Sequence, residues 1–270
     1  VLEMRRRDRP RTWGLRGDFE PVVERENRLE VPERTLADGT IRTKVDLEAV
    51  RKAAKQLLEQ GCDAVAILFA NVYANPENEM SAVAEVRAMW PNAHVSCSSE
   101  ILPEIREFER FSTTALNAYL QPEVSGYLHR LEDALKSGGF SGEFMIVQSN
   151  GGVMGVETAC HYPIRTALSG PAAGVIAAGY IASCAGYENI ITGDMGGTSF
   201  DVSLIAEGES MLSDVRITHF THDLNEVITL RKCIHRLRQV GIGTTVLGND
   251  LADSRQDELE VEIINLLHRK

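Results

Sequence analysis

The chain lacks the features that mark membrane proteins, disulfide-rich secreted proteins and zinc-finger proteins. Its 270 residues contain no apolar run close to the roughly 20 residues that span a bilayer, and no signal-peptide pattern opens the sequence. The five cysteines are scattered and form no C-x-x-C pair. Such a set is typical of free thiols in a reducing compartment. We therefore expect a cytoplasmic protein with no membrane partner.

Two further absences limit the chemistry. His219 and His222 are three residues apart, but no third ligand stands at a spacing that suits zinc. No G-x-S-x-G element occurs, so nothing supports a serine hydrolase. The acidic segment Glu100–Arg110 could supply a carboxylate pair for acid–base catalysis, although a charged helix start is the favoured interpretation.

The charge balance is acidic. The net charge of −11 argues against nucleic acid as a partner, because the molecule as a whole repels polyanions. A basic cluster between Arg5 and Arg11 is interleaved with Glu and Asp, which favours a solvated surface there. With 43% hydrophobic residues, the chain is long enough for one large domain or two smaller ones. It begins at Val1 rather than at Met, and we expect an excerpt or a processed subunit.

Helices and strands alternate through the first half of the chain. Residues 1–46 predict irregular structure with a hairpin around Ala37–Thr40. Asp46 is a helix cap, and the helix it starts should run to about Gln60 before Gly61 ends it. The next elements form a strand–helix–strand series: Ala64–Ala70, Asn75 to Trp90, and His94–Ser98. This order is typical of an α/β domain with parallel strand pairing.

The second half is less regular. We expect a long helix over Phe108–Ser137, interrupted or kinked at Pro122, and then a strand over Phe144–Gln148. A helix of small residues should follow over Ala172–Ala185, with Ser169 as its cap. Beyond Asp214 the sequence changes character, and two amphipathic helices are predicted, Val227–Gln239 and Asp257–Leu267.

The segment Ile190–Ile205 carries the strongest functional pattern. An apolar run ends at Asp194, a Gly196-Gly197-Thr198 turn follows, and a second apolar run with Asp201 near its start leaves the turn. Two adjacent glycines allow bare backbone N–H groups to form a nest for phosphate, and a threonine hydroxyl can add a donor. Asp194 at the strand end can hold a hydrated Mg²⁺ beside that phosphate. The alternative is an ordinary Gly-Gly hairpin with an aspartate at its rim.

Two more glycine turns precede this hairpin. Ser149-Asn150-Gly151-Gly152 follows a predicted strand, and Ser169-Gly170 opens a predicted helix, where free N–H groups favour an anion. Loops at the carboxyl ends of parallel strands gather at one edge of a sheet, so the three turns could surround a polyphosphate. For the first of them, a simple strand-exit turn is an equal alternative.

These residues together resemble the ATP-dependent hydantoinase/5-oxoprolinase family, specifically the hydantoinase A type subunit. The resemblance runs from about residue 5 to about residue 212 and rests on an ordered series of segments: Leu29–Arg34, Asp38–Thr40, Ala66–Tyr73, Ser98–Glu104, Glu107–Leu120, Gln148–Gly152, Ser169–Gly174 and Asp194–Asp201. The same segments are similar to the related subunits of acetone- and acetophenone-type carboxylases.

The resemblance implies an α/β fold of the actin-like ATPase architecture, with two ribonuclease-H-like halves around a nucleotide cleft. It implies that ATP and Mg²⁺ activate a cyclic amide, which hydrolysis then opens, and that a hydantoinase B type subunit or domain is the partner. The family's second phosphate loop matches Asp194, Gly196, Gly197 and Thr198. The expected division is 1–110 as the end of the N-terminal region, 111–214 as the start of the ATPase-like domain, and 215–270 as an unassigned, mainly helical tail.

The chain also departs from the family pattern. No first phosphate loop of the same kind precedes residue 194, and residues 215–270 do not resemble the family's glycine-rich nucleoside segment. The architecture is therefore expected to be incomplete, with about half of a nucleotide cleft. Two alternatives remain open: the ATP-using subunit of a ketone carboxylase, and a non-catalytic scaffold that keeps the fold.

Overall fold

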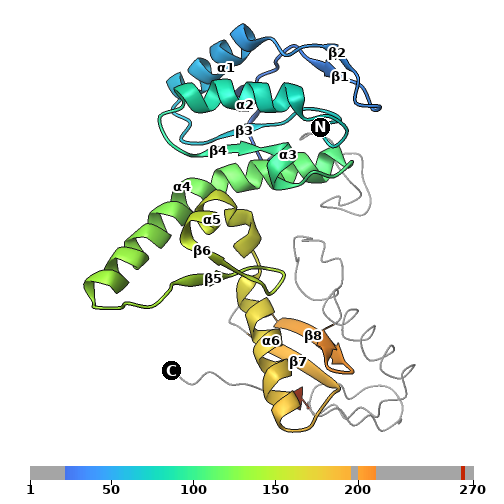
Figure 1. Ribbon diagram of the computed structural model, residues 1–270, viewed down its shortest axis with the longest axis vertical. Coiled ribbons are helices and arrows are strands. Elements are labelled where there is room, and N and C mark those ends of the chain that lie inside the picture. The colour runs from blue at the N-terminus through green and yellow to red at the C-terminus, as the bar shows by residue number, and fades with distance from the viewer. Residues whose placement is uncertain (1–21, 196–199, 211–262, 265–270) are drawn as a thin grey trace, which may run out of the picture. The chain divides into compact units, whose positions relative to one another are not determined.

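The computed structural model describes residues 22–195, 200–210 and 263–264 (Figure 1). The chain divides into two compact units. The first runs to Ile146 and continues over Val153–Ala167, and the second comprises Val147–Gly152 and the chain from Leu168 onward. None of the helices within the described ranges is both long and apolar enough to cross a bilayer.

The first unit opens with a short 3₁₀ turn, Arg25–Asn27, and an antiparallel pair of strands, β1 (Arg34–Thr35) and β2 (Ile41–Thr43). Gly39 in the connecting turn has φ +85°, a conformation that glycine adopts without steric cost. This confirms the hairpin predicted around Ala37–Thr40.

Helix α1 (Leu47–Glu59) follows its predicted signals. The Asp46 carboxylate accepts the backbone N–H groups of Glu48 and Ala49 at 3.0 and 3.1 Å, which satisfies two donors of the first turn. Gly61, with φ +81°, ends the helix. The predicted cap and stop are both confirmed.

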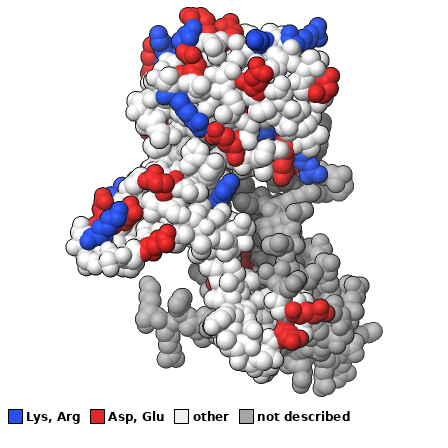
Figure 2. Space-filling model, in the orientation of Figure 1, with Lys and Arg blue, Asp and Glu red and all other residues white. Residues whose placement is uncertain are grey.

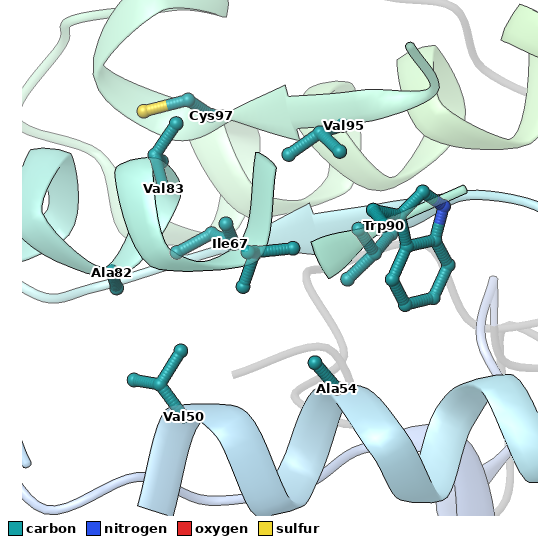
Figure 3. Packing of buried hydrophobic residues seen from close by; sticks show 10 residues of the cluster. Val50, Ala54, Ile67, Ala82, Val83, Trp90, Val95 and Cys97 are labelled. Atoms are coloured by element: carbon teal, nitrogen blue, oxygen red, sulfur yellow. The ribbon is translucent and has the colours of Figure 1, made fainter. Parts of the chain in front are cut away.

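The core of this unit lies around two short parallel strands, β3 (Val65–Ile67) and β4 (Val95–Cys97), joined through α2 (Glu77–Met89). The predicted parallel pairing is confirmed, although each strand is shorter than expected. Val50 and Ala54 of α1 point toward β3 (Figure 3). They pack in one cluster with side chains of β3, α2 and β4: Val65, Ile67, Ala82, Val83, Val86, Trp90, Val95 and Cys97.

A short helix, α3 (Ser98–Ile101), leads to the long helix α4 (Glu107–Ser137). Two glutamates in the first turn of α4 confirm the charged helix start. The helix continues through Pro122, so it is not interrupted there, and the alternative of a kink at Pro122 stays a prediction. Its two halves are both held by packing, which offsets the hydrogen bond that proline cannot make.

The first half of α4 buries polar side chains. Asn117 donates to the Ser96 hydroxyl at 2.9 Å and to the His161 carbonyl at 3.1 Å, and it accepts the Ile164 N–H at 3.2 Å. Gln121, one turn farther on, accepts from the Ser96 hydroxyl at 3.1 Å and donates to the His161 carbonyl at 3.2 Å. Fully buried amides therefore join α4 to β4, to the last residue of α5 and to the turn that follows it.

The second half of α4 packs on apolar residues. Strands β5 (Met145–Val147) and β6 (Val153–Gly155) pair, and α5 (Val156–His161) and a 3₁₀ turn (Pro163–Thr166) follow. Leu128 of α4 clusters with Met154, Val156 and Ala159. Strand β6 was not predicted: three residues after a glycine turn are too few to show a strand period.

The second unit contains helix α6 (Ser169–Cys184) and a four-stranded sheet. Its strands are β7 (Ile190–Met195), β8 (Phe200–Ala206), β9 (Glu209–Ser210) and β10 (Ile263–Ile264), in the order β10-β7-β8-β9. Strand β10 is parallel to β7, and the other neighbours are antiparallel.

The structure corrects one expectation for the tail. Ile263 and Ile264 fall within the predicted helix Asp257–Leu267, but they form β10. The free edge of β7 supplies backbone partners that a local helical pattern does not reveal, and two adjacent β-branched residues suit a strand. The predicted helix Val227–Gln239 and the pair His219 and His222 lie outside the described residues.

Candidate functional site

The β7–β8 hairpin places two carboxylates opposite one another. Asp194 of β7 pairs with Asp201 of β8, and the register continues to Ile190 and Ile205. Because side chains alternate along a strand, Asp201 and Ile205 are on the same face of the sheet, and so are their partners Asp194 and Ile190. The predicted hairpin is confirmed, and its strands bring together two residues that are seven positions apart.

Helix α6 covers that face. A methyl group placed on Gly179 of α6 would stand 2.9 Å from the Ile205 Cδ1 atom, so helix and strand are in close contact there. Contacts of α6 with β7, β8 and β9 agree with this placement. The face that carries Asp194 and Asp201 is therefore the face on which α6 lies.

The N-terminal end of α6 lies toward the end of β7 that carries Asp194. The helix ends at Cys184 and β7 begins at Ile190, so the chain reverses direction between them. From the contact at Gly179, the helix rises roughly 14 Å to Gly170 at 1.5 Å per residue. From Ile205 to Asp201 the strand covers roughly the same length at about 3.4 Å per residue. The start of α6 and the two aspartates are thus at a similar level along the sheet.

Two backbone donors at this helix start remain available. The first N–H groups of a helix have no intrahelical acceptor, and Pro171 has no N–H to offer. Ala172 donates to the Leu168 carbonyl at 3.2 Å, and Leu168 donates to the Ser149 hydroxyl at 3.3 Å. Ser169 and Gly170 therefore supply the donors that an anion could meet.

The predicted cap at Ser169 is wrong. Leu168 is the N-cap residue and Ser169 is already helical, with no side-chain bond at the cap. The hydroxyl that serves this end comes instead from Ser149, which a local sequence window cannot reveal. Helix α6 also has no charged residue in its sequence. Figure 2 shows an uncharged surface at α6, whereas charges of both signs mingle over α1 and α2. No acidic side chain of α6 itself opposes an anion at its start.

The turn Ser149–Gly152 bonds largely to itself. Gly151 donates to the Gln148 carbonyl at 2.9 Å, and Gly152 donates to the Asn150 side-chain oxygen at 2.9 Å. The Gly152 carbonyl in turn accepts the Gln148 N–H at 2.8 Å. Both glycine N–H groups are thus engaged within the turn, and its predicted contact with a nucleotide stays a prediction.

The central residues of the predicted phosphate loop, Gly196, Gly197 and Thr198, lie outside the described residues. Among the residues that the structure describes, no group of three or more His, Cys, Asp or Glu side chains could hold a metal ion. Two opposed carboxylates nevertheless fit Mg²⁺, which keeps several waters and typically takes one or two carboxylates together with phosphate oxygens.

A second polar cluster lies at the carboxyl ends of β3 and β4. The fully buried Glu79 carboxylate accepts four hydrogen bonds, from the N–H groups of Phe69 and Ser99, the Ser98 hydroxyl and the Cys97 thiol, at 2.6–3.1 Å. Burial, together with the neighbouring Glu79 charge, raises the pKa of Cys97 to about 12. No sequence pattern predicts this cluster, because a lone glutamate in a helix normally faces solvent.

Arg110 completes the support of the same loop. Its fully buried guanidinium donates to the Phe69 carbonyl at 3.0 Å and to the Glu104 carbonyl. Glu79 and Arg110 therefore bind the N–H and the carbonyl of one residue, Phe69. The Glu79 carboxylate is satisfied within the cluster, whereas the buried Nε atom of Arg110 has no hydrogen-bond partner among the described residues. The bonds of both side chains to the Phe69 backbone indicate a structural role.

Comparison with known proteins decides the family. The hydantoinase/oxoprolinase model matches residues 110–261, and the hydantoinase/oxoprolinase N-terminal region matches residues 1–89. The chain belongs to the hydantoinase/oxoprolinase family. The match reaches residue 261, farther along the chain than the motif resemblance that ends near residue 212.

Several curated relatives of this hydantoinase-family chain are enzyme subunits. The caprolactamase subunit alpha of Pseudomonas jessenii is 36% identical over 192 residues, which are 71% of this chain and 28% of that protein. The acetophenone carboxylase gamma subunit of Aromatoleum aromaticum is 32% identical over 193 residues, 69% of this chain and 26% of that protein. The 5-oxoprolinase of Saccharomyces cerevisiae is 35% identical over 168 residues, 61% of this chain and 13% of that protein.

Two solved structures are similar in fold. The ATP-dependent caprolactamase from Pseudomonas jessenii has a TM-score of 0.64 at 33% identity, over 75% of this chain and 29% of that one. A nucleotide-free acetone carboxylase has a TM-score of 0.62 at 32% identity, over 71% of this chain and 27% of that one. These neighbours agree with the predicted α/β class. The chain spans less than a third of the length of each of these relatives.

Proposed function

We propose that this chain is part of an ATP-dependent amidohydrolase that binds Mg-ATP and opens a cyclic amide of the hydantoin or 5-oxoproline type. The observation that carries the proposal is the position of Asp194 and Asp201 on the sheet face that α6 covers, level with the start of that helix. A carboxylate pair beside free helix N–H groups suits a metal-bound polyphosphate. The predicted actin-like architecture remains part of this proposal.

Each residue has a defined task. Asp194 would hold Mg²⁺, with Asp201 beside it, while Ser169 and Gly170 would donate backbone N–H groups to phosphate oxygens. Gly196, Gly197 and Thr198 would complete the phosphate contacts, as the family resemblance implies. Bound Mg²⁺ would neutralise charge on a phosphoryl group as it moves from ATP to the ring amide oxygen. That transfer would make the ring carbon more electrophilic, so that water could add to it. Cleavage of the C–N bond would then open the ring, and hydrolysis of the resulting acyl phosphate would release phosphate.

A partner subunit is part of the proposal. The relatives with 36% and 32% identity are named as alpha and gamma subunits, so they act within assemblies. We expect a hydantoinase B type subunit or domain to contribute to the substrate site of this chain. A second candidate function is ATP-dependent carboxylation of a ketone, which the similarity to acetophenone and acetone carboxylase subunits favours.

Calorimetric titration of the chain with Mg-ATP tests the nucleotide site. The Asp194→Ala variant should lose most of the affinity, whereas Glu188→Gln, an exposed carboxylate at the opposite end of β7, should bind like the parent. Unchanged binding in Asp194→Ala would show that the phosphate-loop assignment is wrong.

Product analysis of the assembly with its partner separates the two enzymatic candidates. Hydantoin or 5-oxoproline should be opened with release of ADP. A requirement for bicarbonate and a ketone would identify the carboxylase instead. If the assembly binds Mg-ATP and converts neither class of substrate, the scaffold alternative gains support.

A further inference from the structure

We propose that Ser149 and Gly151 are positioning residues, which hold the first turns of α6 and thereby aim the Ser169 and Gly170 N–H groups, and that they are not ligands of phosphate. The inference rests on the proposed nucleotide site, because it assigns a task to residues beside that site. It reverses the expectation that the Ser149–Gly152 turn itself binds the nucleotide.

The Ser149–Gly152 turn uses its glycine N–H groups for its own hydrogen bonds. A phosphate-binding nest needs free backbone N–H groups. The N–H groups of Gly151 and Gly152 already bond to the Gln148 carbonyl and to the Asn150 side chain. The turn is therefore closed on itself, and it has little to offer an anion through its glycines.

The Ser149 hydroxyl binds the start of α6. It accepts the N–H of Leu168, the N-cap residue of α6, at 3.3 Å. No side chain of α6 provides a cap of its own. A residue from a distant turn thus fixes the point at which the helix begins, and the next two N–H groups are the free ones at Ser169 and Gly170.

Gly151 brings the turn close to the second turn of α6. Its φ is +84°, and a methyl group added there would overlap the Cδ1 atom of Ile176 on α6. Glycine suits the positive φ of this position, and it lets the turn approach α6 so closely that the Ile176 side chain would have to shift if a Cβ atom were added. Ser149 and Gly151 therefore hold α6 at two levels, its start and its second turn.

Two measurements on the full chain test the inference: hydrogen exchange of the hydrogen-bonded Leu168 and Ala172 amides without ligand, and the affinity for Mg-ATP. Ser149→Ala removes the hydroxyl that accepts the Leu168 N–H, so exchange of these amides should rise about five- to tenfold and affinity should fall by a similar factor. Ser149→Thr keeps the hydroxyl and should restore both values.

Gly151→Ala should also raise exchange in α6, and adding Ile176→Ala should recover part of the loss by removing the overlapping side chain. Gly139→Ala is the matched control. Gly139 has nearly the same φ, +85°, but open space around its Cβ position, so α6 exchange should not change.

The outcomes are distinct. If Ser149→Ala weakens Mg-ATP binding while α6 exchange stays at the parent rate, Ser149 is a direct ligand and the inference is overturned. If the parent chain does not bind Mg-ATP, the proposed nucleotide site fails, and the exchange data alone decide whether the turn holds α6. Parent-like exchange in both Ser149→Ala and Gly151→Ala would overturn the inference that the turn holds α6.

Discussion

Asp194 and Asp201 stand directly opposite each other on antiparallel strands, with Asp194 exposed and Asp201 partly buried. Like charges in this relationship repel and destabilise a strand pair. A cation between the strands would reverse that effect. The pair therefore links the stability of the hairpin to ligand binding, and the two properties should respond to mutation with opposite signs.

Asp201→Asn should make the free protein more stable and its Mg-ATP complex weaker. Removal of one like charge should raise the free energy of unfolding by about 0.2–1 kcal/mol without divalent cations. Urea unfolding without Mg²⁺ and calorimetry with Mg-ATP measure the two effects. Glu188→Gln removes one negative charge away from the pair and should change neither. A loss of stability in Asp201→Asn would contradict the repulsive pair.

Glu79→Ala should be among the most destabilising single changes in the first unit. It leaves the N–H groups of Phe69 and Ser99, a hydroxyl and a thiol without their acceptor in a fully buried place. We expect a loss of about 3–5 kcal/mol in the free energy of unfolding, measured with urea. Glu59→Ala, at the exposed end of α1, should stay within about 0.5 kcal/mol of the parent.

Cys97 should resist alkylation at pH 8, whereas the exposed Cys184 should react. Burial is the main cause of the raised pKa of Cys97, about 12, so almost no reactive thiolate is present at that pH. Mass spectrometry of peptides after a timed pulse of iodoacetamide distinguishes the two sites. Rapid labelling of Cys97 in the folded protein would contradict its buried placement.

The same raised pKa predicts a pH effect on stability. The unfolded chain releases the Cys97 proton near the ordinary pKa of 9.0, and the folded chain does so only near 12. The folded state thus binds more protons between these values, so its stability falls as pH rises from about 9 to about 12. Cys97→Ala should show a shallower fall than the parent in urea unfolding across this range.

Asn117→Ala should loosen α4 from its neighbours. The substitution leaves the Ile164 N–H without its acceptor and removes donors to the Ser96 hydroxyl and the His161 carbonyl. A loss of about 2–4 kcal/mol in the free energy of unfolding is expected. Glu123→Ala changes an exposed residue of the same helix and should have little effect. Similar losses in both variants would argue against the buried network.

Local signals predicted several elements well. Asp46 and Gly61 define α1 because a cap and a positive-φ stop act within a few residues of the helix they bound. The hairpin around Asp194 followed from two alternating runs and a glycine turn. The register that opposes Asp194 and Asp201 continues along the hairpin to Ile190 and Ile205, and the role of both aspartates in the predicted site stays a prediction.

The features that the sequence patterns did not predict correctly depend on contacts between distant residues. Ser169 has the residue type of a cap, but the Ser149 hydroxyl, about twenty positions earlier, serves that end of α6. Ile263 and Ile264 pair with β7 across some seventy positions, which outweighs a helical pattern. The buried role of Glu79 depends on donors near the carboxyl ends of β3 and β4. No periodicity within a single segment contains this information.

The buried polar side chains of α4 determine the axial position of the helix. An apolar face can slide by one turn and still bury similar area. Arg110, Asn117 and Gln121 lie at helical spacing along α4, and each has hydrogen-bonding partners on other segments at a fixed height. A displacement of one turn, about 5.4 Å, would leave several of them unmatched at once. The buried hydrogen bonds therefore specify a single axial position of α4 against its neighbours.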